Sequence, residues 1–186
     1  VCQKQMSLGV EKDIIQFIRS KDEECMDILK NSLKDGGCAG IILNTVARAQ
    51  DFAQKLSECF PECEMIQMHS QFIISDRAEI EREILKRAGK NSTPEQRNKL
   101  IIVGTQVLEQ SLDIDFDVMI TDLCPMDLLL QRIGREHRHK GRKRPLCLQK
   151  AKCYVLTETR VVYDKWLLQR TADKLPEYFC LPDDIP

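Results

Sequence analysis

The sequence predicts an α/β fold in which a mostly parallel sheet has helices on both faces. Two observations lead to this prediction. Apolar runs of strand length are separated mostly by segments whose apolar residues recur at helical spacing. The runs are almost continuously apolar, which is typical of parallel strands buried on both faces. With 186 residues, of which 42% are hydrophobic and 31% charged, the chain can bury a full core and has a globular composition.

The residues before the first predicted strand, which begins at residue 39, do not show one consistent pattern. Residues 1–10 show no clear pattern. Apolar residues keep helical spacing between Glu11 and Leu33, so one interrupted helix or two helices both fit, ending at Gly36. The residues with this spacing are Ile14, Ile15, Ile18, Met26, Leu29 and Leu33.

A strand-turn-helix unit then repeats along the chain. Asn44 and Thr45 stand where a helix cap is expected, between a strand and an apolar helical stripe. The polar loop at 90–98 contains Pro94 and is expected to be exposed and mobile. The expected elements are strand 39–43, a helix to Phe60, strand 63–68, a helix from about Asp76 to Gly89, strands 100–103 and 117–121, a helix from about Pro125, strand 152–156, and a last helix with Val161, Val162, Trp166 and Leu167.

Polar side chains follow several of these strands. The carboxyl ends of parallel strands meet at one edge of a sheet, where functional groups gather. We therefore expect one shared rim that contains Asn44, Thr45, His69, Ser70, Thr105, Gln106 and Asp122.

The helix after Pro125 is predicted to carry Gln131 and three arginines, Arg132, Arg135 and Arg138. Residues three apart are neighbours on a helix, so the three guanidinium groups would share about one face. Such an array suits phosphate, because guanidinium binds oxygens bidentately and keeps its proton. The chain contains no G-x-x-x-x-G-K-[ST] phosphate loop, so by itself it should not hydrolyse ATP.

Composition excludes several other classes. No apolar run approaches the roughly 20 residues that span a bilayer, so we expect a cytoplasmic protein without membrane contact. The nine cysteines follow no zinc-ligand spacing, and we expect reduced thiols and no metal site. Because the chain begins at Val1 and ends in a Pro/Asp segment, we expect it to be a fragment of a longer chain.

Two motifs resemble those of a known family. The sequence Q-R-I-G-R-E-H-R after T-D-L-C-P resembles motif VI of superfamily 2 helicases, and G-T-Q-V-L-E-Q-S-L-D resembles their motif V. Together with D-I-D-F-D and the H-R-H ending, they look like the CRISPR-associated helicase-nuclease of type I systems. Similar fragments are I-I-L-N-T-V-A-R-A-Q and M-H-S-Q-F, and the resemblance runs from about residue 37 to the end.

The resemblance implies a RecA-like helicase C-terminal domain over 37–158, after an entry segment at 1–36 and before a C-terminal helix and tail at 159–186. It would be the second half of an ATP-dependent DNA helicase that unwinds and helps degrade foreign DNA in CRISPR interference. The implied partners are single-stranded DNA, the first RecA-like domain and the nuclease domain of the parent chain, and a CRISPR surveillance complex. ATP and Mg²⁺ would be bound mainly by the missing first domain, in a prokaryotic cytoplasm.

The resemblance also implies residue roles. Arg138 would be the arginine finger, Arg135 a second γ-phosphate contact and Gln131 a partner of the phosphate or attacking water, while Asp113 would contact the ribose or the metal shell. Arg132 would be structural, and Glu109 would brace the motif V loop. The DNA backbone would meet Asn44, Thr45, His69, Ser70, Thr105 and Gln106.

Two departures from the family pattern and two alternatives accompany this reading. Glu136 stands where the family usually has a hydrophobic residue, and we expect it to pair at the surface with Arg132 or Lys140; Gln71 replaces a usual arginine. Taken by themselves, Asp115 and Asp117 fit carboxylates that only solvate the entry to a strand. The alternative functions are a helicase domain acting on RNA and a non-catalytic module that binds nucleic acid or protein.

Overall fold

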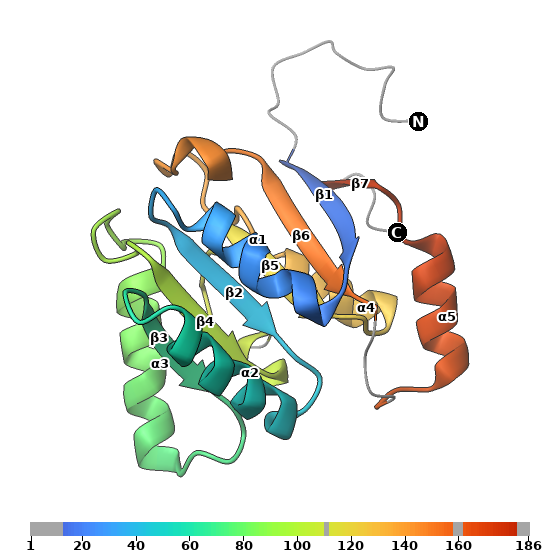
Figure 1. The fold of residues 1–186 in the computed structure, drawn as a ribbon, viewed down its shortest axis with the longest axis horizontal. Helices are drawn as coiled ribbons and strands as arrows, with labels where there is room; N and C mark the ends of the chain where they lie inside the picture. The colour runs from blue at the N-terminus through green and yellow to red at the C-terminus, as the bar shows by residue number, and fades with distance from the viewer. Residues whose placement is uncertain (1–12, 110–111, 158–161, 182–186) are drawn as a thin grey trace.

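The computed structural model describes residues 13–109, 112–157 and 162–181 and contains one seven-stranded sheet. Its strands are β1 (Asp13–Ser20), β2 (Cys38–Ile42), β3 (Glu64–Met68), β4 (Leu100–Gly104), β5 (Val118–Asp122), β6 (Ala151–Leu156) and β7 (Tyr178–Leu181). They lie in the order β3-β4-β2-β5-β6-β1-β7 (Figure 1). Every pairing is parallel except that of β7 with β1. The predicted mostly parallel sheet is confirmed.

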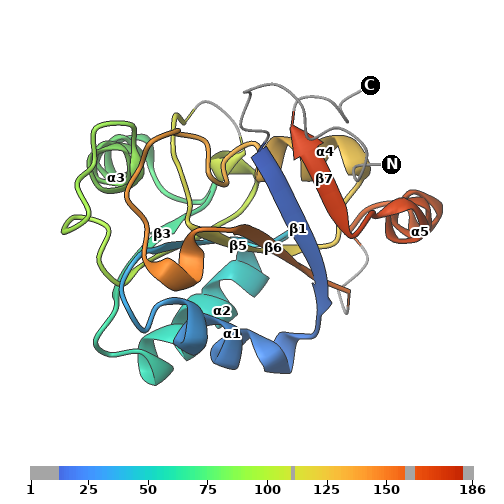
Figure 2. The same ribbon diagram turned by 90° about the horizontal axis from the view of Figure 1, so that it is seen from above.

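In the described ranges, five α-helices cover the two faces of the sheet, so the predicted arrangement with helices on both faces is confirmed. Helices α1 and α2 lie on one face, and α3, α4 and α5 lie on the other (Figure 2). Each face has its own buried cluster, since alternate residues of a strand point to opposite sides. The helices are α1 (Cys25–Ser32), α2 (Val46–Cys59), α3 (Ile74–Ala88), α4 (Met126–Ile133) and α5 (Lys165–Lys174).

The helix expected from Glu11 is wrong over its first half, where the chain forms β1. Ile15 and Phe17 are buried while Ile14 is 50% exposed, so burial alternates with the period of a strand. The helical spacing of the isoleucines does not decide the structure, because β1 is held between β6 and β7. The segments before residue 37 and after residue 158 therefore contribute strands to the same sheet as the residues between them.

The last helix also differs from the prediction. It begins at Lys165, after Asp164 caps it by accepting hydrogen bonds from the backbone N–H groups of Trp166 and Leu167. Trp166 is 62% exposed, and the residues buried on this helix are Leu168 and Thr171. The apolar residues that indicated the helix therefore do not face the core, and Val161 lies outside the described residues.

Phe116 packs directly over β2 at Gly40. A Cβ atom at position 40 would lie 2.4 Å from the nearest carbon of the Phe116 ring. Both residues belong to the buried interior, and Phe116 is fully inaccessible to solvent. The absence of a side chain at Gly40 is therefore what lets the segment before β5 approach the sheet.

Among the described residues, no helix is long and apolar enough to cross a membrane. Nor does the described part of the chain bring together three or more His, Cys, Asp or Glu side chains able to hold a metal ion. Cys25, Cys38, Cys124 and Cys153 are buried free thiols, as expected of small apolar residues. Cys180 is disulfide-bonded, so the expectation of reduced thiols is wrong at this position.

Candidate functional site

The expected rim of polar residues exists at the carboxyl edge of the sheet. Met68, Gly104 and Ile42 end neighbouring parallel strands in matching register, and Ile42 is paired in turn with Thr121 of β5. The residues that follow these strand ends are therefore brought to one edge, as predicted. They are Asn44, Thr45, His69, Ser70, Thr105, Gln106 and Asp122, the last being the final residue of β5.

The rim residues differ in how far solvent reaches them. Asn44 and Thr105 are only 5% and 2% exposed, whereas Ser70 is exposed and Thr45 and Gln106 are half-buried. The Asn44 side chain donates to the Leu123 carbonyl at 2.9 Å and accepts from Arg132 at 3.0 Å. Its amide is thus engaged within the fold.

Two further rim contacts join separate loops. Gln106 donates through Nε2 to the Asn44 carbonyl at 3.2 Å and to the Tyr163 hydroxyl at 3.1 Å. Thr45 caps α2, as the sequence predicts, by accepting from the Arg48 backbone N–H at 3.2 Å. The loops after β2 and β4 are therefore linked by side-chain hydrogen bonds.

His69 is packed into the rim. It is 5% exposed, its ring stacks on Phe72 with centroids 4.3 Å apart, and its Nε2 lies 3.4 Å from Nε2 of Gln50. Burial lowers the pKa of the imidazole. The ring therefore offers an apolar and hydrogen-bonding surface at neutral pH.

Arg132 connects α4 to the rim through several hydrogen bonds. Its side chain is fully buried and bonds Glu109 through Nε at 2.7 Å and the Thr121 hydroxyl at 2.7 Å. It also donates to the carbonyls of Ile42 and Asp122. A helical side chain leans toward the helix N-terminus, which lets a residue near the end of α4 reach back to the carboxyl edge.

The arginines do not form the single helical face expected from their spacing. Helix α4 ends at Ile133, with Gly134 as its C-cap, and His137 has a positive φ of 49°. Arg135 and Arg138 therefore lie in an irregular segment beyond the helix. That segment runs beside the chain entering β5, because Phe116 and Glu136 form an isolated bridge.

Arg135 and Arg138 reach the segment that follows β4. Arg135 donates to the Glu109 carbonyl at 2.9 Å, and burial lowers the pKa of its guanidinium. Arg138 donates through Nε to Asp113 at 2.7 Å and holds the pKa of that carboxyl below its usual value. Both side chains of this pair are open to solvent, with 42% and 52% exposed. Gln131, one turn before Arg135, is exposed.

A hollow of about 460 Å³ lies beside Arg138. It is bounded by the segment from Lys90 to Pro94 and by residues 138–143, which include His139 and Lys143. Its lining is rich in cationic side chains. This corner, which we call the cationic corner, is therefore concave and positively charged, unlike the hydrogen-bonded rim.

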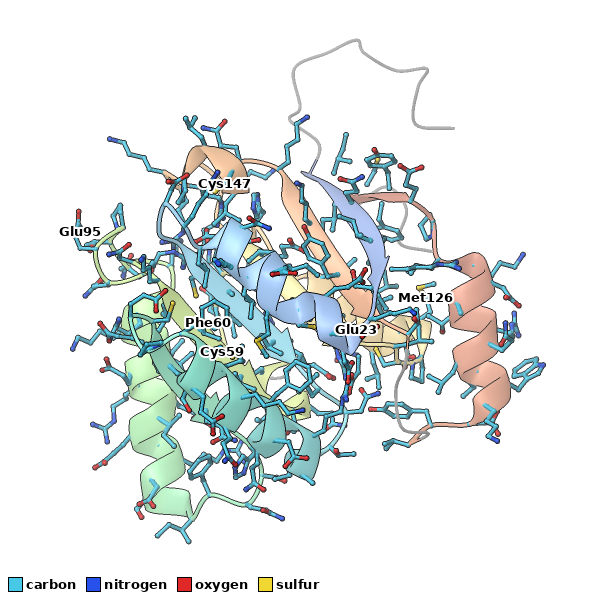
Figure 3. All side chains as sticks on the ribbon, in the orientation of Figure 1. Glu23, Cys59, Phe60, Glu95, Met126 and Cys147 are labelled. Atoms are coloured by element: carbon cyan, nitrogen blue, oxygen red, sulfur yellow. The ribbon has the colours of Figure 1, made fainter. Side chains whose placement is uncertain are left out.

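Asp115 and Asp117 do not solvate a strand entry, which corrects one reading of the sequence. They are 0% and 2% exposed and form, with Arg97, Arg142 and Arg144, a buried ion-pair cluster that we call the Asp115 network. In the loop at 90–98, Glu95 lies on the outside (Figure 3), whereas the Arg97 side chain is only 3% exposed. The loop at 90–98 is thus anchored in the interior rather than wholly at the surface.

The expectation that Glu136 pairs at the surface is wrong. Glu136 is 2% exposed, and its Oε1 accepts a hydrogen bond from the Lys152 backbone N–H at 2.6 Å. Burial raises the pKa of its carboxyl well above the ordinary value. A neutral carboxyl group at this position can occupy a site that suits a hydrophobic residue.

Comparison with known proteins shows which family the chain belongs to. The model for the C-terminal part of the CRISPR-associated nuclease/helicase Cas3 matches residues 35–141, which is more than half of the chain. The chain belongs to this Cas3 family. A Cas3 nuclease/helicase of Streptococcus thermophilus is 47% identical over 184 residues, covering 94% of this chain and 20% of that protein. The chain therefore spans about a fifth of the length of this Cas3 relative.

Solved Cas3 structures have the same fold. The T. fusca Cas3-AMPPNP structure matches with a TM-score of 0.85 and 31% identity, over 96% of this chain and 23% of that one. A chain of a CRISPR RNA-guided surveillance complex, pre-nicking, matches with a TM-score of 0.74 and 33% identity, over 90% and 22%. The C-terminal domain of the DEAD-box protein Dbp5 shares the fold alone, at 21% identity and a TM-score of 0.53 over 84% and 81% of the two chains. The RecA-like helicase C-terminal fold of this Cas3 domain is thereby confirmed.

Proposed function

We propose that this domain is the second RecA-like half of an ATP-dependent DNA helicase or translocase that acts in CRISPR interference in a prokaryotic cytoplasm. It would complete an ATP cleft whose other wall is a first RecA-like domain, in a protein that also carries a nuclease domain. A CRISPR surveillance complex would deliver the single-stranded DNA. The membership in the Cas3 family supports this proposal.

The observation that carries the proposal is that Glu109 links the rim, through Arg132, to the segment that carries Arg135 and Arg138. Its buried guanidinium holds Glu109, Thr121 and Asn44 together. Three residues further on, beyond the end of α4, Arg135 contacts the Glu109 carbonyl, so the segment that carries Arg135 and Arg138 is joined to the rim through Glu109 and Arg132. A motor domain needs this type of link, because a change at the nucleotide must reach the bound strand.

The segment that carries Arg135 and Arg138 has the hydrogen-bond donors that a phosphate requires. Arg138 and Arg135 supply guanidinium groups, and the buried Nε atom of Arg135 has no hydrogen-bond partner in the described part of the chain. An oxygen of a γ-phosphate would accept from such donors, and Gln131 would meet the phosphate or the attacking water from the exposed end of α4. Asp113 is already paired with Arg138, so ATP would have to compete for this guanidinium.

The fit to Mg²⁺ is different. Within the ranges that the structure describes, no three His, Cys, Asp or Glu side chains are grouped so that they could hold the ion. ATP with Mg²⁺ would be held mainly by the first RecA-like domain. The contribution that we assign to this domain is charge stabilisation by its arginines, which is typically worth about 10³–10⁵ in rate.

At the rim, a DNA strand would meet the exposed groups first. Ser70, Thr45 and Gln106 are accessible, whereas Asn44, Thr105 and His69 are buried and would act through the backbone groups that they position. Contacts of this kind bind sugar and phosphate without reading sequence. Glu109 would brace the loop through its bond to Arg132.

The test uses the full-length protein that contains this domain. Arg138→Ala should lower the DNA-stimulated ATP hydrolysis rate by about 10³-fold or more, because the developing charge on the phosphate loses its partner. Arg170→Ala is a matched control, since Arg170 lies on α5 against the exposed Trp166 ring at 4.7 Å. An unchanged rate in Arg138→Ala would refute the arginine-finger assignment.

Two further measurements separate the alternatives. Single-stranded DNA should stimulate ATP hydrolysis more than RNA does, and equal stimulation by both would count against the CRISPR reading. The 186-residue chain alone should bind nucleotide weakly and show no turnover, since it contains no phosphate loop. Magnesium-dependent hydrolysis by the purified chain would contradict this expectation.

A further inference from the structure

Arg138 lies in a segment without regular structure, so other contacts must fix its position. Its backbone N–H donates to Oδ1 of Asp115 at 2.8 Å. The preceding residue, His137, has a positive φ of 49° and donates its own N–H to the Phe116 carbonyl at 3.0 Å. Asp115 therefore holds the main chain at the residue whose guanidinium faces the cationic corner.

Asp115 is itself held tightly from the opposite side. Its Oδ2 lies 2.6 Å from Nε of Arg142, and both of its oxygens accept from NH2 of Arg144 at 2.9 Å. Asp115 is 0% exposed, and the two arginine side chains are 8% and 6% exposed. The carboxylate thus has little freedom to follow a movement of Arg138.

Asp117 connects the same cluster to the sheet. Its Oδ2 accepts from the Cys38 backbone N–H at 2.7 Å, and its Oδ1 lies 2.9 Å from NH2 of Arg97 and also bonds Arg144. Within the part of the chain that the structure describes, the Asp117 carboxylate bonds Cys38, Arg97 and Arg144 and not Arg138. The network therefore contains two buried carboxylates, of which one holds the Arg138 main chain and the other holds the start of β2.

Burying the charged groups of this network costs folding free energy, so their arrangement calls for a reason. Two carboxylates and three guanidinium groups are withdrawn from water, and apolar residues of similar volume are often at least as stable in such places. Buried ionic groups of this kind fix one arrangement of the surrounding chain in some proteins. Here the arrangement that they fix includes the segment carrying Arg138.

We propose that Asp115 is a positioning residue, which sets the approach of the Arg138 guanidinium to the γ-phosphate. Arg142 and Arg144 clamp the carboxylate of Asp115, and this carboxylate in turn holds the Arg138 backbone N–H. This inference rests on the proposed function, because it assigns Arg138 to the nucleotide. Asp115 itself touches neither nucleotide nor water in this role. A displacement of about 1 Å in a catalytic group can cost about 10²-fold in rate.

The experiment compares variants of the full-length protein in DNA-stimulated ATP hydrolysis. Asp115→Ala should lower kcat by about 10²-fold with KM for ATP nearly unchanged, since the finger acts chiefly in the transition state. Asp115→Asn retains one oxygen that can accept the Arg138 N–H and should recover part of the loss. Asp117→Ala is the matched comparison: it removes a neighbouring buried carboxylate that also bonds Arg144, and it should lower thermal stability but reduce kcat of the folded protein far less than Asp115→Ala does.

Combination with Arg138→Ala separates positioning from general damage. If Asp115 acts through Arg138, the double variant should be no slower than Arg138→Ala alone. Amide hydrogen exchange adds a measurement independent of activity, in which the peptide containing residue 138 should exchange faster in Asp115→Ala but not in Asp117→Ala. Should Asp115→Ala fail to fold, Asp115→Asn carries both measurements, with a smaller expected loss of about 10-fold.

The outcomes distinguish the two proposals. If Asp115→Ala and Asp117→Ala lower kcat equally, or if the Asp115 loss persists undiminished in the Arg138→Ala background, Asp115 is merely structural. The finger assignment would then still stand on the Arg138→Ala result. If Arg138→Ala leaves the rate unchanged, both the finger assignment and the positioning role fail.

Discussion

Burial of the Glu136 carboxyl group should make the stability of this domain depend on pH in a specific direction. The group is 2% exposed, its Oε1 accepts from the Lys152 N–H, and its buried Oε2 has no hydrogen-bond partner among the residues that the structure describes. Loss of hydration is the largest cause of its raised pKa, which Asp115 and Asp117 raise further. The Lys152 N–H and the charge of Arg144 oppose this shift.

The sign follows from comparing proton binding in the two states. Below the ordinary pKa of about 4.5, Glu136 is protonated in both the folded and the unfolded chain. Above it the unfolded chain ionises while the folded domain keeps its proton, so the free energy of unfolding falls as pH rises. This decline continues until the pH passes the raised pKa of the folded state, with a limit of about 1.4 kcal/mol per pH unit for one group.

Glu136→Gln isolates this contribution, because glutamine does not ionise and keeps an oxygen for the Lys152 N–H. The free energy of unfolding of the variant minus that of the original chain should increase with pH, by up to about 1.4 kcal/mol per unit. Urea denaturation between about pH 5 and pH 8 measures the difference. Glu23→Gln is the control, since Glu23 is an exposed carboxylate at the surface near α1 (Figure 3).

The result that would refute this reasoning is a difference that stays constant or decreases as pH rises. Either outcome would mean that Glu136 ionises in the folded state as readily as in the unfolded chain. The comparison with Glu23→Gln removes effects of net charge, because both variants lose one carboxylate. A parallel slope in both variants would also contradict a specific effect of burial.

Three other predictions concern packing and reactivity. Arg132→Met should lower the free energy of unfolding by about 3–5 kcal/mol because Glu109 is left buried and unpaired, and adding Glu109→Leu should restore much of it; urea denaturation measures both. Gly40→Ala should cost about 1–3 kcal/mol in the same assay, because its new Cβ would collide with the Phe116 ring. A thiol reagent at neutral pH should modify the exposed Cys59 (Figure 3) long before Cys38, because burial raises the pKa of the Cys38 thiol to about 12.

Matched changes make these three predictions decisive. Gly134→Ala adds the same methyl group where the nearest atom is 3.4 Å away, so a loss equal to that of Gly40→Ala would argue against the Phe116 collision. A loss of less than about 1 kcal/mol in Arg132→Met would mean that Glu109 finds another partner. Labelling of Cys38 in the folded chain at the rate seen in urea would show that β2 opens readily.

The central strands could be predicted because burial on both faces leaves a continuous apolar run, as in residues 100–103. At β1 the same kind of reasoning failed. Ile14, Ile15 and Ile18 fit a helical period as well as a strand, and the choice was made by pairing with β6, whose residues lie more than a hundred positions later. Hydrophobic spacing within a window cannot report a partner outside it.

The candidate site shows the same division. The rim could be predicted because it depends only on parallel strand ends, and the helicase resemblance implied a structural Arg132 and a bracing Glu109, while their direct contact is a finding of the structure. The Asp115 network could not, since nothing in D-I-D-F-D indicates that Arg97 and Arg144 reach these carboxylates in the interior. Likewise, Glu136 looks like a surface residue until its neighbours are known.

The place of β1 in the sheet has a consequence for how the chain folds. Gln16 of β1 is paired with Tyr178 of β7, 162 positions away, and the other edge of β1 is completed by β6. Such non-local pairing raises the contact order and slows folding. During synthesis β1 leaves the ribosome long before either neighbour, so its backbone and Ile15 remain open to unwanted strand pairing until nearly the whole domain has been made.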